Sequence, residues 1–241
     1  MRLALALLLA LATPAMADMT AAERDAFRAE VRAYLLENPE VLAEAMTELQ
    51  VRQDAAAAQA DLQLVVDNKD AIFNDGTSWV GGNPNGDITV VEFMDYRCGY
   101  CRKSFSEVAE LVKSDGNIRF VVKEFPILGE QSLLSTQFAI AVKRLYGPEA
   151  YENAHNALMT LRGDATTATL SQLATDLGHD APGLMIAMAS PEVRAEIDAN
   201  HALGQTMQIN GTPTFIIQNQ MLRGYIPLQD MRTIVADERK G

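Results

Sequence analysis

Hydrophobic and polar positions along the chain change their spacing several times, and each change predicts a different element. From residue 18 to about residue 74, apolar side chains recur every three or four residues, the period of an amphipathic helix. Thr20 and Glu23 have the spacing of a capping box, and Asn38-Pro39 interrupts the repeat. Because the residue before a proline rarely continues a helix, we expect one helix to end near Glu37 and a second to begin at Pro39.

The second of these helices is predicted to be long. About 30 residues at 1.5 Å per residue span roughly 45 Å, and the apolar stripe along them approximates an irregular heptad repeat. A stripe of this length needs a covering surface. Either the rest of the same chain covers it, or copies of the helix cover one another in an oligomer, and the pattern alone leaves both possibilities open.

Two short, nearly continuous apolar runs follow, at 88–94 and 118–125, and they are typical of strands covered on both faces. A helical pattern at 104–113 lies between them. A strand, a crossover helix and a second strand form a βαβ unit, so we expect these two strands to be parallel neighbours. A shorter strand is predicted at 77–80, ahead of this unit.

The helical period then returns and occupies much of the remaining chain, with breaks at glycine and proline positions. The predicted helices are 132–146, 148–161, 170–177, 183–189 and 191–207. Two strands, 214–217 and 221–225, and a closing helix at 227–238 complete the pattern. Strands and helices are therefore mixed, which predicts an α/β protein.

Composition narrows the choice of partners. The chain has 241 residues with a formal net charge of −12, and 48% of them are apolar. Nucleic-acid binding needs a concentrated basic surface, so this charge argues against a nucleic-acid partner. The apolar share is ample for a sizeable core.

Residues 1–17 have the features of a secretory signal peptide. A short positive start is followed by an apolar run at 3–12 and by a small-residue cleavage site that ends at Ala17. We expect cleavage after Ala17 and a location in the bacterial periplasm, where disulfides persist. The alternative is an N-terminal membrane anchor, although the apolar run is too short to span a bilayer.

The two cysteines of the chain, Cys98 and Cys101, form a Cys-x-x-Cys motif between the first strand of the βαβ unit and its helix. At a helix N-terminus Cys98 is expected to be stabilised as a thiolate, the nucleophile of disulfide exchange. Cys101, one turn further along, is expected to be buried and to resolve the mixed disulfide. A purely structural disulfide, half of a zinc site and a Cu(I) site are the alternatives.

A second motif, 211–215, reads Gly-Thr-Pro-Thr-Phe. Proline is tolerated at the first residue of a strand. If the Thr212–Pro213 bond were cis, it would turn the backbone sharply and place Thr212 beside Cys98. The backbone of Thr212 could then receive a substrate peptide by strand addition.

Together, the stretch from Glu92 to Cys101 and the motif around Thr212-Pro213 resemble the DsbA-like family of thioredoxin-fold thiol-disulfide oxidoreductases. The resemblance implies an α/β thioredoxin fold at 75–241 with a helical insertion at about 131–207, preceded by an extended helical region at 18–74. It implies Cys98 as the nucleophile, Cys101 as the resolving thiol and a redox-active Cys98–Cys101 disulfide. It also implies a cis-proline substrate loop at Thr212-Pro213.

Glu92 matches a buried acidic position of the family and is a proton-transfer candidate for Cys101. The alternative is an acid at the surface of a strand edge. Substrate is further expected to contact Gly99 and Tyr100. We expect no cofactor and no metal.

The residues between the cysteines and before the proline differ from those of the strongest oxidases of this family. The difference indicates disulfide isomerisation or reduction rather than oxidation. Those relatives carry Pro-His between the cysteines and Val before the proline, whereas this chain has Gly99-Tyr100 and Thr212, a pairing similar to disulfide isomerases. The stretch at 34–42 resembles the leader of ScsC-type relatives, which associate through it, often as trimers.

The expectation is therefore a periplasmic isomerase or reductase that acts on protein disulfides. Its partners would be misfolded or reduced secreted proteins, a membrane thiol-redox partner and further copies of itself, most often a trimer joined through residues 18–74. A monomeric DsbA-type dithiol oxidase and a Cu(I)-binding module of a copper-tolerance system are the alternatives.

Overall fold

A computed structural model describes residues 19–240 of the chain, so the predicted signal peptide at 1–17 lies outside the described residues. The chain divides into two compact units, the first ending at Ala55 and the second running Ala56–Gly241. This division falls inside a helix. The domain limits expected from the sequence, 18–74 and 75–241, stay predictions.

The first two helices, α1 (Ala21–Glu37) and α2 (Glu40–Asp67), begin and end close to their predicted limits. Thr20 caps α1: its hydroxyl accepts from the backbone N–H of Glu23 at 3.3 Å, and the Glu23 carboxylate accepts from the N–H of Thr20 at 2.9 Å. This is the reciprocal capping box that the sequence predicts.

One break in this region escaped prediction. The Asn68 side-chain amide donates to the Leu64 carbonyl at 2.8 Å and so occupies an acceptor at the end of α2. Such side-chain competition favours the end of a helix. A separate short helix, α3 (Lys69–Phe73), follows.

The second unit is built on a five-stranded sheet in the order β1-β3-β2-β4-β5. The central strands β2 and β3 are parallel, as the βαβ pattern predicts, and the other three pairings are antiparallel. The strands are β1 (Trp79–Gly82), β2 (Ile88–Met94), β3 (Ile118–Glu124), β4 (Thr214–Ile217) and β5 (Gln220–Arg223).

The limits of β1 and β5 differ most from prediction, and each has a local reason. Strand β1 begins two residues late because the Asp75 carboxylate accepts from the backbone N–H groups of Thr77 and Ser78, which form a turn. Strand β5 ends at Arg223 because Gly224 has a φ of 93°, and its N–H donates to the Pro213 carbonyl at 2.9 Å. Tyr225 therefore leaves the sheet and lies in a loop.

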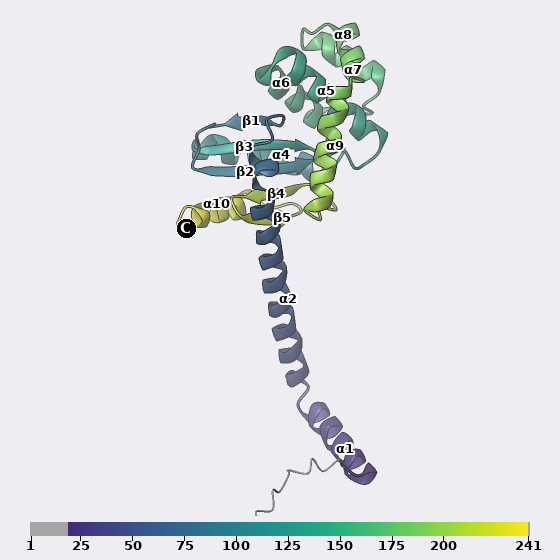
Figure 1. The fold of residues 1–241 in the computed structure, drawn as a ribbon, viewed down its shortest axis with the longest axis vertical. Coiled ribbons are helices and arrows are strands. Elements are labelled where there is room, and N and C mark those ends of the chain that lie inside the picture. Colours follow the sequence, from purple (N-terminus) through teal and green to yellow (C-terminus); the bar gives the residue numbers. More distant parts are fainter. Residues whose placement is uncertain (1–18, 241) are drawn as a thin grey trace, which may run out of the picture. The chain divides into compact units, whose positions relative to one another are not determined.

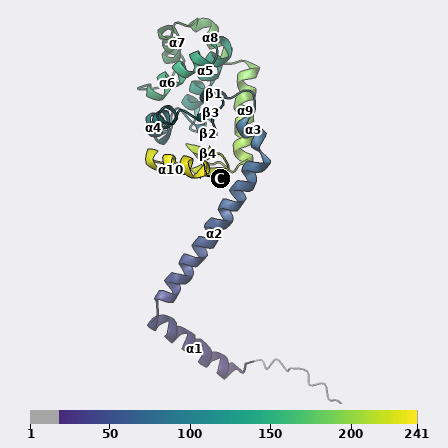
Figure 2. The ribbon, with the colours of Figure 1, turned by 90° about the vertical axis from the view of Figure 1, so that its left-hand side faces the viewer.

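Helices cover both faces of the sheet. Figure 2 shows the sheet nearly edge-on, with α4 (Gly99–Asp115) and α10 (Leu228–Glu238) on one side. Helix α3 and helix α9 (Pro191–Thr206) lie on the other. Side chains alternate between the two faces along each strand. In β2, Val90 and Met94 belong to the core on the α4 side, while Val91 and Phe93 belong to the core on the α9 side.

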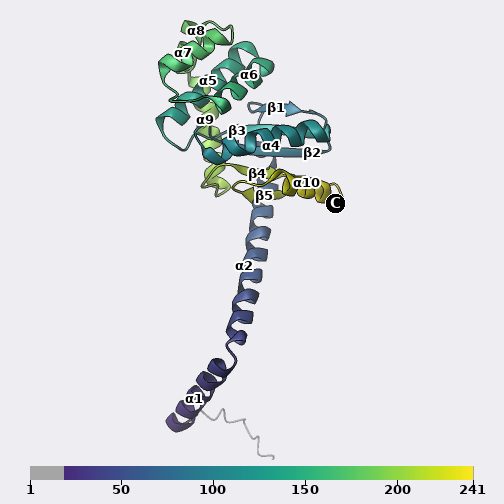
Figure 3. The ribbon, with the colours of Figure 1, turned by 180° about the vertical axis from the view of Figure 1, so that it is seen from behind.

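The helical insertion lies between β3 and β4 in the chain, close to its predicted limits. Its first four helices gather beyond the β1 edge of the sheet (Figures 1 and 3). They are α5 (Glu130–Tyr146), α6 (Pro148–Thr160), α7 (Thr167–Asp176) and α8 (Ala181–Ala187). Helix α9 then returns along the sheet. The fold is a thioredoxin fold with a helical insertion, as expected.

No helix within residues 19–240 combines the length and the apolar character that crossing a membrane requires.

Candidate active site

Cys98 is the N-cap residue of α4, so it lies at the position that the Cys-x-x-Cys pattern predicts. Its backbone is extended, and the helix begins at Gly99. The first N–H groups of a helix have no partner within the helix and carry partial positive charge. The Cys98 sulfur is therefore at the positively charged end of α4. Only 7% of Cys98 is exposed.

Cys101 lies one turn further along α4 and is fully buried. Both cysteines are free thiols in this structure. Burial, and after it the negative charge of Glu92, raise the pKa of the Cys101 thiol far above its ordinary value. The two sulfurs therefore have different environments. Cys98 is at the helix terminus, whereas Cys101 stays protonated in the core.

The Thr212–Pro213 peptide bond is cis, and the second motif lies beside the first. The Cys98 thiol donates to the Thr212 carbonyl at 3.1 Å, across 114 positions of sequence. The carbonyl of the next residue, Pro213, accepts a hydrogen bond from the Gly224 N–H at 2.9 Å. The juxtaposition that the sequence left conditional on a cis bond is thus present.

Glu92 lies in the central strand β2, on the α4 side of the sheet, and only 3% of it is exposed. A surface position at a strand edge, the alternative considered from the sequence, is excluded by this burial. Its Oε1 atom has no hydrogen-bond partner within residues 19–240. Burial raises the pKa of Glu92 to about 8. Glu92 is also among the residues that line a pocket of about 500 Å³, together with residues of α4, β1, β3 and α6.

The loop between β2 and Cys98 is held by a set of bonds that the sequence did not reveal. The Asp95 carboxylate accepts from the backbone N–H of Arg97 at 2.7 Å and from those of Ile127 and Leu128 at 2.8 and 3.1 Å. The loop before the cysteines is thereby tied to the loop after β3. The local pattern does not reveal this link, because Ile127 and Leu128, two of the three partners of Asp95, lie more than 30 positions away.

Tyr100 projects from the start of α4 and is 62% exposed beside the cysteines. It stacks on Tyr225, with ring centroids 6.2 Å apart. The Lys103 ammonium lies 3.9 Å from the centroid of the Tyr225 ring, and the Tyr225 hydroxyl donates to the Glu107 carboxylate at 2.9 Å. Tyr225 is a site residue that sequence reasoning missed, since it was assigned to a strand.

Within the described residues, no three His, Cys, Asp or Glu side chains converge as metal ligands would.

A dithiol at a helix N-terminus, facing a cis-proline on a sheet with this topology, defines a thioredoxin-fold thiol-disulfide oxidoreductase. Residues 74–237 match the family described as thioredoxin, and the chain belongs to that family. It is of the DsbA-like, ScsC-type branch: residues 23–56 match the family described as the copper resistance protein ScsC N-terminal domain.

Solved structures agree with this assignment. A thioredoxin-like oxidoreductase from Silicibacter pomeroyi is 40% identical with a TM-score of 0.68, covering 72% of this chain and 99% of its own. The thiol-disulfide exchange protein alpha-DsbA2 from Wolbachia pipientis is 26% identical with a TM-score of 0.70, covering 76% and 97%. Proteus mirabilis ScsC in a transitional conformation is 25% identical with a TM-score of 0.66, covering 91% and 98%.

Proposed function

We propose that Cys98 is the nucleophile of this oxidoreductase and that Cys101 is the resolving thiol. The observation that carries the proposal is the position of the Cys98 sulfur, at the N-terminus of α4 and 3.1 Å from the carbonyl before the cis-proline. The Cys98 thiolate attacks one sulfur of a substrate disulfide, forming a mixed disulfide, and the other substrate sulfur leaves as a thiolate that takes a proton.

The mixed disulfide can be resolved in two ways. Cys101 can attack the Cys98 sulfur, which forms the Cys98–Cys101 disulfide and releases the reduced substrate. Alternatively, a second thiolate of the substrate attacks the substrate sulfur that is bonded to Cys98. This forms a new disulfide within the substrate and releases Cys98 as a thiolate. The second outcome is isomerisation, and the enzyme ends it reduced.

Glu92 supplies the proton transfer for Cys101 in this scheme. Cys101 must lose its proton in order to attack, and its thiol is held protonated by burial. A carboxyl with a pKa of about 8 exchanges protons readily near neutral pH. The unpartnered Oε1 of Glu92 and the adjoining pocket support this function.

The substrate peptide is proposed to lie against Thr212 and Pro213 on one side and against Gly99 and Tyr100 on the other. Thr212 offers backbone groups to an extended peptide. Tyr100 offers a large exposed ring close to the nucleophile. Aromatic rings of this kind bury apolar side chains of many shapes, which suits an enzyme with varied protein substrates.

The direction of reaction is proposed to be isomerase-like or reductase-like, with a membrane thiol-redox partner that keeps the dithiol reduced. The support is the Gly99-Tyr100 pair, which places no imidazolium between the cysteines. Refolding of scrambled ribonuclease with catalytic amounts of the reduced protein tests this. Recovery above that with glutathione alone is expected for the natural sequence and not for Cys98→Ser.

In the same assay, Cys101→Ser is expected to accumulate as a mixed disulfide with the substrate, visible on a non-reducing gel. No recovery above glutathione would favour the oxidase alternative. That alternative is examined directly by adding the oxidised protein to reduced, unfolded ribonuclease.

Self-association, most simply as a trimer, is the proposed arrangement of the chain. The ScsC N-terminal match is consistent with an oligomer. Helix α1 has no buried residue in the single chain, and the apolar side chains of α2 at Leu42, Met46 and Leu49 are at least half exposed. Apolar stripes of this length are usually covered by a partner helix.

The periplasm is the proposed location. Support comes from the signal-like segment at 1–17 and from a periplasmic thioredoxin-like protein of Salmonella enterica that shares the fold. Cell fractionation with a mass measurement of the mature N-terminus tests it, and a chain that keeps residues 1–17 would contradict cleavage after Ala17.

A further inference from the structure

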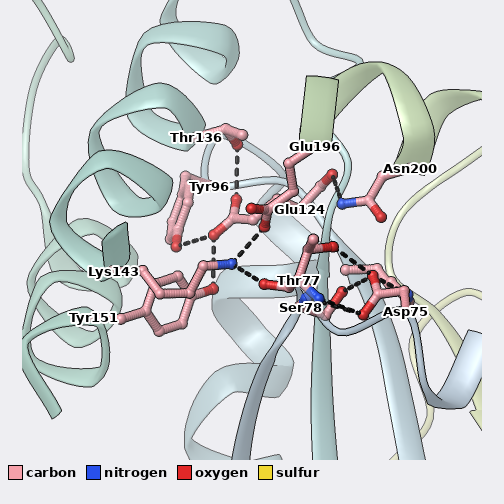
Figure 4. Close-up of polar contacts among 11 residues, drawn as sticks. Asp75, Thr77, Ser78, Tyr96, Glu124, Thr136, Lys143, Tyr151, Glu196 and Asn200 are labelled. Carbon is pink, nitrogen blue, oxygen red and sulfur yellow. Dashed lines mark hydrogen bonds and ion pairs between the residues drawn. The ribbon is translucent and has the colours of Figure 1, made fainter. Parts of the chain in front are cut away.

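The side chain of Glu124 is a buried carboxylate that contacts the loop leading to Cys98. Glu124 ends strand β3, is 1% exposed and accepts three hydrogen bonds from hydroxyl groups (Figure 4). The Tyr96 and Tyr151 hydroxyls both donate to its Oε1 atom at 2.7 Å, and the Thr136 hydroxyl donates to Oε2 at 2.8 Å. All three donors are themselves buried.

The donors come from different parts of the fold. Thr136 lies on α5 and Tyr151 on α6, both in the helical insertion, while Tyr96 lies in the loop that leads to Cys98. From α9, the Asn200 amide donates to the backbone carbonyl of Glu124 at 3.1 Å. The end of β3 is thus the point where the insertion and the active-site loop are joined by buried polar contacts.

In the part of the chain that the structure describes, the Glu124 carboxylate is hydrogen-bonded by neutral hydroxyl groups and has no cationic partner in an ion pair. Within residues 19–240, the nearby Lys143 ammonium bonds the Glu196 carboxylate and the Thr77 carbonyl, and no salt bridge reaches Glu124. Burial raises the pKa of Glu124 to about 7, although the three hydroxyl donors act in the opposite direction. An apolar side chain would fill the same space without this desolvation penalty, so the carboxylate needs another explanation.

The connection to the nucleophile is short. Tyr96 precedes Cys98 by two residues, and its hydroxyl is held by Glu124 while its backbone carbonyl accepts from Arg102 Nε at 2.6 Å. His155 Nδ1 lies 3.1 Å from the same hydroxyl and can donate to it. The side chain and the main chain of Tyr96 are therefore both anchored, one to β3 and the other to α4.

We propose that Glu124 is a positioning residue for Cys98, acting through the Tyr96 hydroxyl to hold the sulfur at the N-terminus of α4. The inference rests on the proposed role of Cys98 as the nucleophile. It assigns to Tyr151 and Thr136 the different task of anchoring the helical insertion to the same carboxylate.

The two tyrosines provide a matched pair for the experiment. Tyr96→Phe and Tyr151→Phe each remove one buried hydroxyl that donates to the same oxygen at the same distance. Both variants are expected to lose similar thermal stability and to remain folded, because only one oxygen atom is lost. A purely structural function of Glu124 would make the two variants behave alike.

The readout is the rate of alkylation of reduced Cys98 by iodoacetamide across a range of pH, together with the equilibrium constant with glutathione. For Tyr96→Phe we expect the alkylation rate near neutral pH to fall by about threefold or more, as loss of one buried hydrogen bond allows. For Tyr151→Phe we expect a rate within about 1.5-fold of the natural sequence, because its hydroxyl is not on the loop.

Equal rates in the two variants, whether both changed or both unchanged, would overturn the inference. Cys98→Ser distinguishes that failure from a failure of the proposed function. If Cys98→Ser were alkylated as fast as the natural protein, Cys98 would not be the reactive thiol at all. If it is inert and the two tyrosine variants match, only the positioning function of Glu124 is wrong.

Discussion

Glu92 is the residue at which burial has the most direct chemical consequence. It lies in the central strand with an unpartnered oxygen, and burial raises its pKa to about 8 from an ordinary value of 4.5. A carboxyl whose pKa is higher in the folded state binds its proton more tightly there than in the unfolded chain. It therefore contributes stability below the unfolded pKa, and this contribution is lost as the pH rises toward the folded value.

Glu92→Gln should consequently change how stability depends on pH. As the pH rises from 4.5 to about 7, the unfolding free energy of the reduced natural protein should fall by about 3 kcal/mol because of Glu92. The amide of Glu92→Gln does not titrate, so the variant should lack this fall. Urea unfolding at the two ends of this range measures it. Glu44→Gln, which changes an exposed carboxyl on α2, is the control and should leave the pH dependence unaltered. Identical pH dependence in Glu92→Gln and the natural protein would contradict the assignment.

At the scale of elements, the end of α2 and the short helix α3 belong to the catalytic unit. Val65 and Ile72 are buried in the core on the α9 side of the sheet. Asp75, just beyond, bonds the buried ammonium of Lys123 on β3 at 2.7 Å. Burial alone would raise the pKa of Asp75, but the hydrogen bonds from Lys123 and Ser78 outweigh it and hold the pKa well below its usual range. Removing residues 18–74 as a block would therefore damage the core.

Ile72→Ala tests this packing. Deleting a fully buried isoleucine should lower the free energy of unfolding by roughly 2–4 kcal/mol. Ile186→Ala is the matched control, because Ile186 on α8 is 77% exposed and its truncation should change stability by less than about 0.5 kcal/mol. Chemical denaturation of both variants gives the comparison. A loss at Ile72 no larger than at Ile186 would show that α3 contributes nothing to the core.

At the scale of the whole molecule, the proposed oligomer separates two activities. Exchange with a small disulfide needs one Cys98, whereas rearranging several disulfides in one misfolded chain gains from neighbouring sites held at high effective concentration. Helix α1 and the part of α2 up to Ala55 lie in the first compact unit and contain none of the active-site residues, so changes to their exposed side chains would affect catalysis through assembly.

The double variant Leu42→Asp, Leu49→Asp should therefore become monomeric, because it places charges on the apolar series of α2. Light scattering should give the mass of one chain for the variant and of three for the natural protein. Ribonuclease isomerisation should fall, while reduction of a small disulfide should not. Thr47→Asp adds a charge to the same helix outside the apolar series, so it should change neither the mass nor the ribonuclease isomerisation. A monomeric natural protein would remove the oligomer proposal.

Much of the fold could be predicted from the sequence because its signals are local. Apolar periodicity, the capping box at Thr20, Asn38-Pro39 and the Cys-x-x-Cys motif each act over a few residues, and the helices and strands they predict are present. Some helix and strand limits differ from prediction where side chains bond the backbone, as at Asn68 and Asp75. The proposed roles of Cys98 and Cys101 follow from chemistry that needs only their spacing.

Only the tertiary structure decided which polar groups are buried and what they contact. Glu92 and Glu124 are both buried on the neighbouring strands β2 and β3, yet Glu92 has an unpartnered oxygen and Glu124 has three hydroxyl donors. The partners of Asp95 and Tyr225 come from segments far along the chain. The physical reason is that burial and polar satisfaction depend on elements that meet only after folding, while helix caps and periodicity depend on neighbours in the chain.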